Sequence, residues 1–128
     1  MRHALLALIA PFVLAALPAS ALPVQPFTPA ALAEAQAANQ PILVDVHADW
    51  CPTCRAQDPT ISSLAQDPAF ANLVILKLDF DSQKAERKAL GVEKQSTLIA
   101  YRGKAERSRS TGITDPGQIR TIAAAALR

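Results

Sequence analysis

Runs of apolar residues alternate along this chain with segments whose apolar positions recur every three or four residues. Two runs, Ile42 to Val46 and Val74 to Leu78, are apolar at nearly every position, which is typical of parallel strands covered on both faces. A third run, Thr97 to Tyr101, precedes Gly103 and a polar stretch from Ala105 to Ser110, which predicts a hairpin. The pattern therefore predicts three inner strands and one edge strand.

Helical segments lie between and after these strands. Their start and stop signals predict four helices, from Pro29 to Ala38, from Arg55 to about Ala65, from Asp81 or Ser82 to Leu90, and from Asp115 to the C-terminus. Pro59 should kink the second helix, and Leu127 should lie on the core face of the last. This order of elements predicts an α/β fold with a mixed central sheet flanked by helices.

The beginning of the chain has a different pattern. Arg2 and His3 precede an apolar segment from Ala4 to Leu17, and the small residues Ala19 to Ala21 follow. This is the pattern of a secretory signal peptide, here residues 1–21. An uncleaved membrane anchor is the alternative, but about 14 apolar residues interrupted by Pro11 fall short of the roughly 20 that a spanning helix needs. We therefore expect export to the bacterial periplasm and no stable membrane insertion after cleavage.

The remaining residues, 22–128, suffice for one compact domain. Residues 22–29 contain prolines and no periodicity, so they are expected to form an extended linker. Lys and Arg number 13 and Asp and Glu number 11, for a formal net charge of +2, and no long run has one sign. This balance indicates no nucleic-acid partner, and we expect a monomer.

The only two cysteines, Cys51 and Cys54, follow the first predicted strand. On a first helical turn, Cα atoms three residues apart are about 5 to 6 Å apart, within the roughly 4.4 to 6.8 Å that a disulfide accepts. Pro52 suits such a turn. Cys51 would stand at the helix N-terminus, where N–H groups and the helix dipole stabilise a thiolate. We therefore expect Cys51 to be the nucleophile, and Cys54, one turn in and less exposed, to be the resolving thiol.

A structural disulfide or a metal site are the alternatives to a redox pair. A disulfide that closes so short a loop restricts the unfolded chain little. A structural zinc site needs about four ligands, and His47 is the only other soft ligand beyond the first few residues. We expect neither a metal nor a bound cofactor. The competing function is a non-enzymatic module whose two thiolates hold a metal ion or cluster, for example between two chains.

Two charged residues interrupt the apolar strands. Asp45 would be a buried carboxylate, which is costly unless it is paired or protonated. It could relay a proton for Cys54, or it could be a strand-end aspartate bonded to backbone N–H groups. Lys77 could pair with Asp45 if their strands are neighbours, or it could extend its ammonium to solvent at the sheet rim.

Several motifs stand together at characteristic spacings: Val44-Asp45, then Trp50-Cys51-Pro52-Thr53-Cys54, then Pro59 and Lys77-Leu78-Asp79. Together they resemble the thioredoxin family over nearly the whole of residues 22–128. The resemblance implies a thioredoxin-like fold and exchange of protein disulfides or dithiols with an upstream redox partner, without a bound cofactor. It also implies that Asp45 is the proton acceptor for Cys54, that Lys77 faces Asp45, and that Trp50 shields the sulfurs. Substrate would contact Trp50, Pro52, Thr53, Ser96 and Thr97.

The run Cys-Pro-Thr-Cys-Arg-Ala is also similar to that of exported reductants of cytochrome c maturation, which favours a reductant. Two residues depart from the family pattern. His47 stands where an aromatic residue is common, and Ser96 stands where the family has a cis-proline. Because a cis bond before a residue other than proline costs about 2.5 to 4 kcal/mol, we expect a trans Gln95–Ser96 bond. We also expect the Ser96 hydroxyl to hydrogen-bond the Cys51 thiolate.

Overall fold

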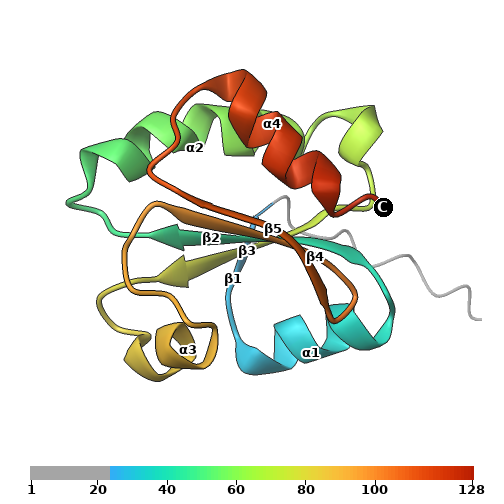
Figure 1. Cartoon of the computed structure of the whole chain (residues 1–128), viewed down its shortest axis with the longest axis horizontal. Coiled ribbons are helices and arrows are strands. Elements are labelled where there is room, and N and C mark those ends of the chain that lie inside the picture. Colours follow the sequence, from blue (N-terminus) through green and yellow to red (C-terminus); the bar gives the residue numbers. More distant parts are fainter. Residues whose placement is uncertain (1–23) are drawn as a thin grey trace, which may run out of the picture.

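The computed structural model describes residues 24–128, which form one five-stranded mixed sheet with helices on both faces (Figure 1). The strands lie in the order β1-β3-β2-β4-β5 and comprise β1 (Gln25–Pro26), β2 (Pro41–His47), β3 (Val74–Asp79), β4 (Thr97–Arg102) and β5 (Ala105–Thr111). The helices are α1 (Pro29–Ala37), α2 (Pro52–Leu64), the short 3-10 helix η1 (Pro68–Phe70), α3 (Lys84–Ala89) and α4 (Pro116–Ala125). The predicted α/β architecture is confirmed, while the predicted signal peptide lies outside the described residues.

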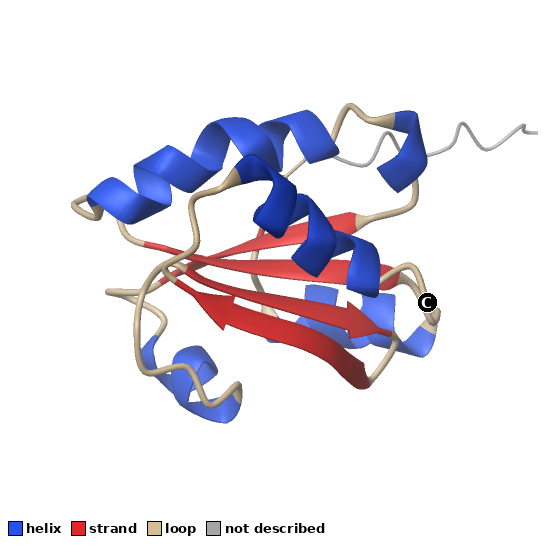
Figure 2. Ribbon diagram, turned by 45° about the horizontal axis from the view of Figure 1, so that its top comes forward, coloured by secondary structure: helices blue, strands red, loops and turns tan. Residues whose placement is uncertain are grey.

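The central strand β2 is buried along its whole length. It pairs in parallel with β3 and antiparallel with β4, so both its edges are hydrogen-bonded. Successive side chains of a strand point to opposite faces. Leu43 therefore packs with residues of α2 and α4, and Val44 packs on the other face against α1 and Phe27. Figure 2 shows α2 and α4 lying over the same face of the sheet.

Local signals set where the helices begin. Thr28 caps α1 by accepting the N–H of Ala31 at 3.0 Å, and Asp115 caps α4 by accepting the N–H of Gln118 at 2.9 Å. Proline follows each cap in the first turn. Each cap satisfies an N–H group that the helix itself leaves without a partner.

The start of α3 differs from the prediction. The Asp79 carboxylate accepts the N–H groups of both Asp81 and Ser82 at 2.9 Å. These bonds hold the two residues in a turn, and α3 begins only at Lys84.

Two predictions about the ends of the domain are wrong. The segment expected to be a linker contains β1, which pairs in parallel with β3, and the buried Phe27, whose N–H donates to Lys77 O at 2.8 Å. Conversely, Leu127 lies beyond α4 and is 37% exposed. The sequence missed β1 because its pairing partner, β3, lies far away in the chain. It missed the exposure of Leu127 because periodicity alone does not show at which residue a helix ends. None of the helices in residues 24–128 is long and apolar enough to cross a membrane.

Candidate active site around two buried cysteines

The two cysteines lie where β2 leads into α2. Cys51 has extended backbone angles and is the N-cap of α2, with its sulfur accepting the N–H of Cys54 at 3.1 Å. Pro52 occupies the first turn, as predicted. Both thiols are unpaired and each cysteine is only 1% exposed, since they pack with Ala48 and Phe80. The expectation that Cys54 is the less exposed of the two is therefore wrong. The two cysteines differ instead in their position on α2, since Cys51 is its N-cap and Cys54 lies within its first turn.

Cys54 has an environment that keeps its proton on sulfur. Its thiol donates to the carbonyl oxygen of Val46 at 3.9 Å. Burial, and next the hydrogen bond with Cys51, raise the pKa of Cys54 to about 11. A thiol with so high a pKa is rarely ionised near neutral pH, so a reaction of Cys54 as a thiolate would require a base.

Asp45 is the buried carboxylate nearest to this point in sequence, one residue before Val46. It is 1% exposed, and neither of its oxygens has a hydrogen-bond partner within residues 24–128. The alternative of a strand-end aspartate bonded to backbone N–H groups is therefore wrong. Burial raises the pKa of Asp45 to about 6, although the positive charge of Lys77 and the His47 side chain oppose the shift. A carboxyl group with this pKa can accept or release a proton near neutral pH.

Lys77 is the residue of β3 in register with Asp45. Its ammonium group lies 3.5 Å from Asp58 Oδ1, and its side chain is 38% exposed. The two predicted alternatives for Lys77, an interaction with Asp45 and an ammonium group at the sheet rim, therefore both hold in part. The ammonium group is partly exposed, and its charge lowers the pKa of Asp45.

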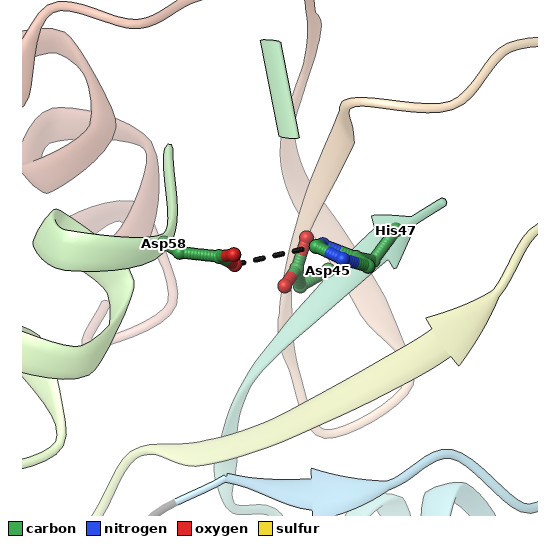
Figure 3. Close-up of side chains that lie close together, drawn as sticks. All are labelled: Asp45, His47 and Asp58. Atoms are coloured by element: carbon green, nitrogen blue, oxygen red, sulfur yellow. Dashed lines mark ion pairs between the residues drawn. The ribbon is translucent and has the colours of Figure 1, made fainter. Parts of the chain in front are cut away.

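Asp58 is the residue of this site that the sequence analysis missed. It lies on α2 four residues after Cys54, so the two share one helix face. His47 lies two residues after Asp45 and therefore on the same face of β2. Figure 3 shows that Asp45, His47 and Asp58 point toward one another, and one polar atom of each lies within 4.8 Å of those of the other two. The i, i+4 spacing from Cys54 was the signal that could have revealed Asp58.

His47 connects this acidic cluster to the surface. Its Nδ1 lies 3.5 Å from Asp58 Oδ1, and its Nε2 lies 3.4 Å from Asp49 Oδ1. The three-residue cluster has the spacing of a metal site, but the Lys77 ammonium beside Asp58 already supplies a positive charge there, so we assign no metal to it. Within residues 24–128 no group of three or more metal-ligand side chains includes either cysteine.

Ser96 adopts a left-handed backbone with φ of 56°, and the Gln95–Ser96 peptide bond is trans, as predicted. Its N–H donates to Val46 O at 2.8 Å, and its carbonyl accepts from the N–H of Gly112 at 3.0 Å and from Gln57 Nε2 at 3.3 Å. Its hydroxyl donates to Gln95 O at 2.6 Å, so the expected bond to the Cys51 thiolate is not formed. These backbone groups are therefore engaged within the domain and not open to a substrate peptide.

The other predicted substrate contacts differ in accessibility. Trp50 is 56% exposed, its indole N–H donates to Asp81 Oδ2 at 2.9 Å, and its ring meets Phe80 edge-on at 6.5 Å. Pro52 is exposed and Thr53 is half-buried. Thr97 is buried, and its hydroxyl bonds Lys94 O and the Thr111 hydroxyl. The accessible surface beside the cysteines thus comes from the motif itself, and Trp50 contacts Phe80, which in turn packs against the two cysteines.

Asp45 also determines how stability depends on pH. Its folded pKa of about 6 exceeds the ordinary value of 3.8. Below pH 3.8, the pKa of Asp45 in the unfolded chain, Asp45 is protonated in both states and its burial carries no ionisation penalty. As the pH rises through about 6, the folded state loses this stability, because the buried carboxyl group must then ionise. We therefore expect Asp45→Asn to raise the free energy of unfolding of the reduced protein at pH 8 by about 3 kcal/mol, with the gain vanishing near pH 4.

Urea denaturation across this pH range measures the effect. Glu34→Gln is the control, because Glu34 is exposed on α1 and its change should alter stability little. A gain from Asp45→Asn that persists unchanged at pH 4 would show that burial does not shift the ionisation of Asp45.

Comparison with known proteins agrees with this geometry. The thioredoxin family model matches residues 24–125. Thioredoxin from Chlamydia muridarum is 35% identical over 74 residues, which are 58% of this chain and 71% of that protein. The crystal structure of Trxlp from Edwardsiella tarda is 44% identical with a TM-score of 0.74, covering 77% of this chain and 95% of that chain.

A more distant structure shares the fold. Malassezia sympodialis thioredoxin is 19% identical, with a TM-score of 0.70 over 80% of this chain and 92% of that chain. The family match, the curated relative and the paired cysteines at the start of α2 agree with one another. The chain therefore belongs to the thioredoxin family and is a thiol-disulfide oxidoreductase.

Proposed function

We propose that this protein is an exported reductant that opens disulfide bonds of other proteins in the bacterial periplasm through Cys51 and Cys54. The observation that carries the proposal is the contrast between the two thiols. Cys51 caps a helix and accepts an N–H hydrogen bond, whereas Cys54 is held as a thiol with a pKa raised to about 11. One group is thus suited to attack first and the other to act second.

In the first step the Cys51 thiolate attacks one sulfur of a substrate disulfide. A bond forms between Cys51 and that sulfur, the substrate disulfide breaks, and the second substrate sulfur leaves as a thiolate that takes a proton from solvent. The N–H of Cys54 and the positive end of α2 stabilise the attacking thiolate.

In the second step Cys54 releases the substrate. Asp45 accepts the thiol proton of Cys54, and the resulting thiolate attacks the Cys51 sulfur. The Cys51–substrate bond breaks, an internal disulfide forms, and the substrate leaves reduced. Lys77 acts through its charge, because it lowers the pKa of Asp45 and so favours the ionised base. A dithiol partner upstream then reduces the internal disulfide again.

The support for a reductant role is that few groups stabilise the thiolates of the reduced cysteine pair. Within residues 24–128 the Cys51 sulfur accepts one hydrogen bond from a backbone N–H, that of Cys54. Burial disfavours the thiolate of Cys54. An oxidant such as DsbA owes its high potential to a stabilised reduced form. The opposite balance here favours giving electrons to substrates.

Substrate would dock on the exposed part of the motif, at Trp50, Pro52 and Thr53. Ser96 and Thr97 would instead shape the floor beneath it, since their polar groups bond within the domain. Export rests on the signal pattern of residues 1–21, in which a basic start, an apolar segment and small residues follow one another.

Substitution of each cysteine should separate the two steps. Cys54→Ser should accumulate a stable mixed disulfide with a substrate such as insulin, because Cys51 still attacks and nothing releases the product. Cys51→Ser should form none. Mass spectrometry after acid quenching measures the adduct, and an adduct on Cys54 in the Cys51→Ser variant would reverse the two roles.

The reduction potential tests the direction of transfer. Related pairs span about −270 mV for thioredoxin to −120 mV for DsbA, and we expect a value near the lower figure. Equilibration with glutathione mixtures, followed by alkylation of the remaining thiols, measures it. A potential near the DsbA value would make the protein an oxidant, and stoichiometric metal in the anaerobically purified protein without disulfide turnover would favour the metal-binding alternative.

The export proposal predicts the N-terminus of the mature chain. When the full chain is expressed in a Gram-negative host, the periplasmic fraction should contain a protein beginning at Leu22, because Ala19-Ser20-Ala21 offers the small residues that signal peptidase requires. The mass of the intact protein measures this. A full-length chain that stays in the cytoplasm would contradict export.

A further inference from the structure

Asp45, in its proposed role as the base for Cys54, needs a route by which its proton can reach solvent. A base buried at 1% exposure must lose the proton it takes from Cys54, and neither of its oxygens has a hydrogen-bond partner in the described part of the chain. A route for that proton has to pass through neighbouring polar groups. Those facing Asp45 are His47 on β2, Asp58 on α2 and Lys77 on β3.

His47 has one ring nitrogen beside the buried cluster and the other beside an exposed carboxylate. Its side chain is 9% exposed, and its Nδ1 faces Asp58 at 3.5 Å. Nδ1 has no hydrogen-bond partner within residues 24–128, so it has an open position toward the cluster. One polar atom of each of Asp45, His47 and Asp58 lies within 4.8 Å of those of the other two, a gap that one water molecule can span with two hydrogen bonds of about 2.8 Å each.

The outer nitrogen of His47 meets the surface. Nε2 lies 3.4 Å from a carboxylate oxygen of Asp49, whose side chain is 99% exposed. His47 also lines a surface cavity of about 290 Å³ together with Asp49, Lys77, Asp79 and residues of β1. Asp79 faces His47 in register from β3, but its Oδ1 is already bonded to the N–H groups of Asp81 and Ser82.

We propose that His47, which lies beside Asp58, is the shuttle that moves protons between Asp45 and solvent at Asp49. This inference rests on the proposed role of Asp45 as the base for Cys54. His47 acts through Asp45 and touches neither reacting sulfur, so it is a positioning residue rather than a catalytic one. Histidine suits this task because it exchanges protons at either ring nitrogen near neutral pH.

The proton balance closes over one redox cycle. When the cysteine pair is oxidised, Asp45 gives the Cys54 proton to His47 Nδ1, and the Nε2 proton leaves to Asp49 and solvent. When the upstream dithiol reduces the pair, a proton enters at Nε2 and the Nδ1 proton returns through Asp45 to Cys54. The two halves leave His47 in its starting tautomer, so the ring does not need to flip.

The two steps can be followed separately with Ellman's reagent as the substrate disulfide. Reduced protein should release one coloured thiolate when Cys51 attacks and a second when Cys54 attacks, giving two phases in a stopped-flow trace. Below pH 6 Asp45 starts protonated and must lose its proton before it can accept another. In that range we expect His47→Phe to slow the second phase about tenfold and to leave the first phase and the rates at pH 8 within about twofold of wild type.

Chemical rescue separates a shuttle from simple packing. In His47→Ala, added imidazole should enter the emptied space beside the cavity and restore the second phase below pH 6. Pyrazole, which has the same shape but is a much weaker base, should not. Glu34→Gln is the matched control, because Glu34 lies on α1, on the other face of the sheet (Figure 1), and should change neither phase.

The possible failures are distinguishable. If the wild type shows no second phase, the proposed function itself fails. If wild type shows both phases but His47→Phe slows them equally at every pH, or changes neither, His47 only packs and the shuttle is wrong. Rescue by pyrazole as well as imidazole would likewise overturn it.

Discussion

The burial of one carboxylate inside the central strand is the constraint on which the site depends. Asp45 lies in β2, whose residues are all buried, and the sheet and α2 exclude water from it. Desolvation opposes its charge and raises its pKa to about 6, so the carboxyl group can change its protonation state near neutral pH. The same burial that costs stability when Asp45 is ionised is what shifts its pKa into this range.

The start of α2 gives the two cysteine side chains different environments. The same helix that makes Cys51 its N-cap places Cys54 one turn in, against the carbonyl of Val46. Only the first thiol meets the electropositive end of the helix, although both are equally buried. Backbone placement alone therefore gives the two thiols different surroundings, and the roles proposed for them follow that difference.

Of the two residues that depart from the pattern of the resembled family, His47 ends β2 and Ser96 directly precedes β4, which pairs with β2. Ser96 donates its N–H to Val46 O, the same carbonyl that the Cys54 thiol contacts, and a proline could not make that bond. His47 places a titratable ring where an aromatic residue is common, and Asp58 pairs with it from α2. Of these two residues, only His47 lies beside Asp45, so its substitution is the departure that bears on the proposed movement of protons.

Much of this protein was determined by local sequence. The apolar runs determined β2, β3 and β4, and the Cys-Pro-Thr-Cys spacing determined the redox pair, because strand burial, helix capping and disulfide reach depend on residues close together in the chain. Tertiary structure decided what depends on distant neighbours. The pairing of β1 with β3, the equal burial of the two thiols, the engagement of the Ser96 backbone and the meeting of Asp58 with His47 all join separate segments. A single sequence shows which side chains are present, but only the packing of α2 on the sheet determines that Asp45, His47 and Asp58 lie side by side.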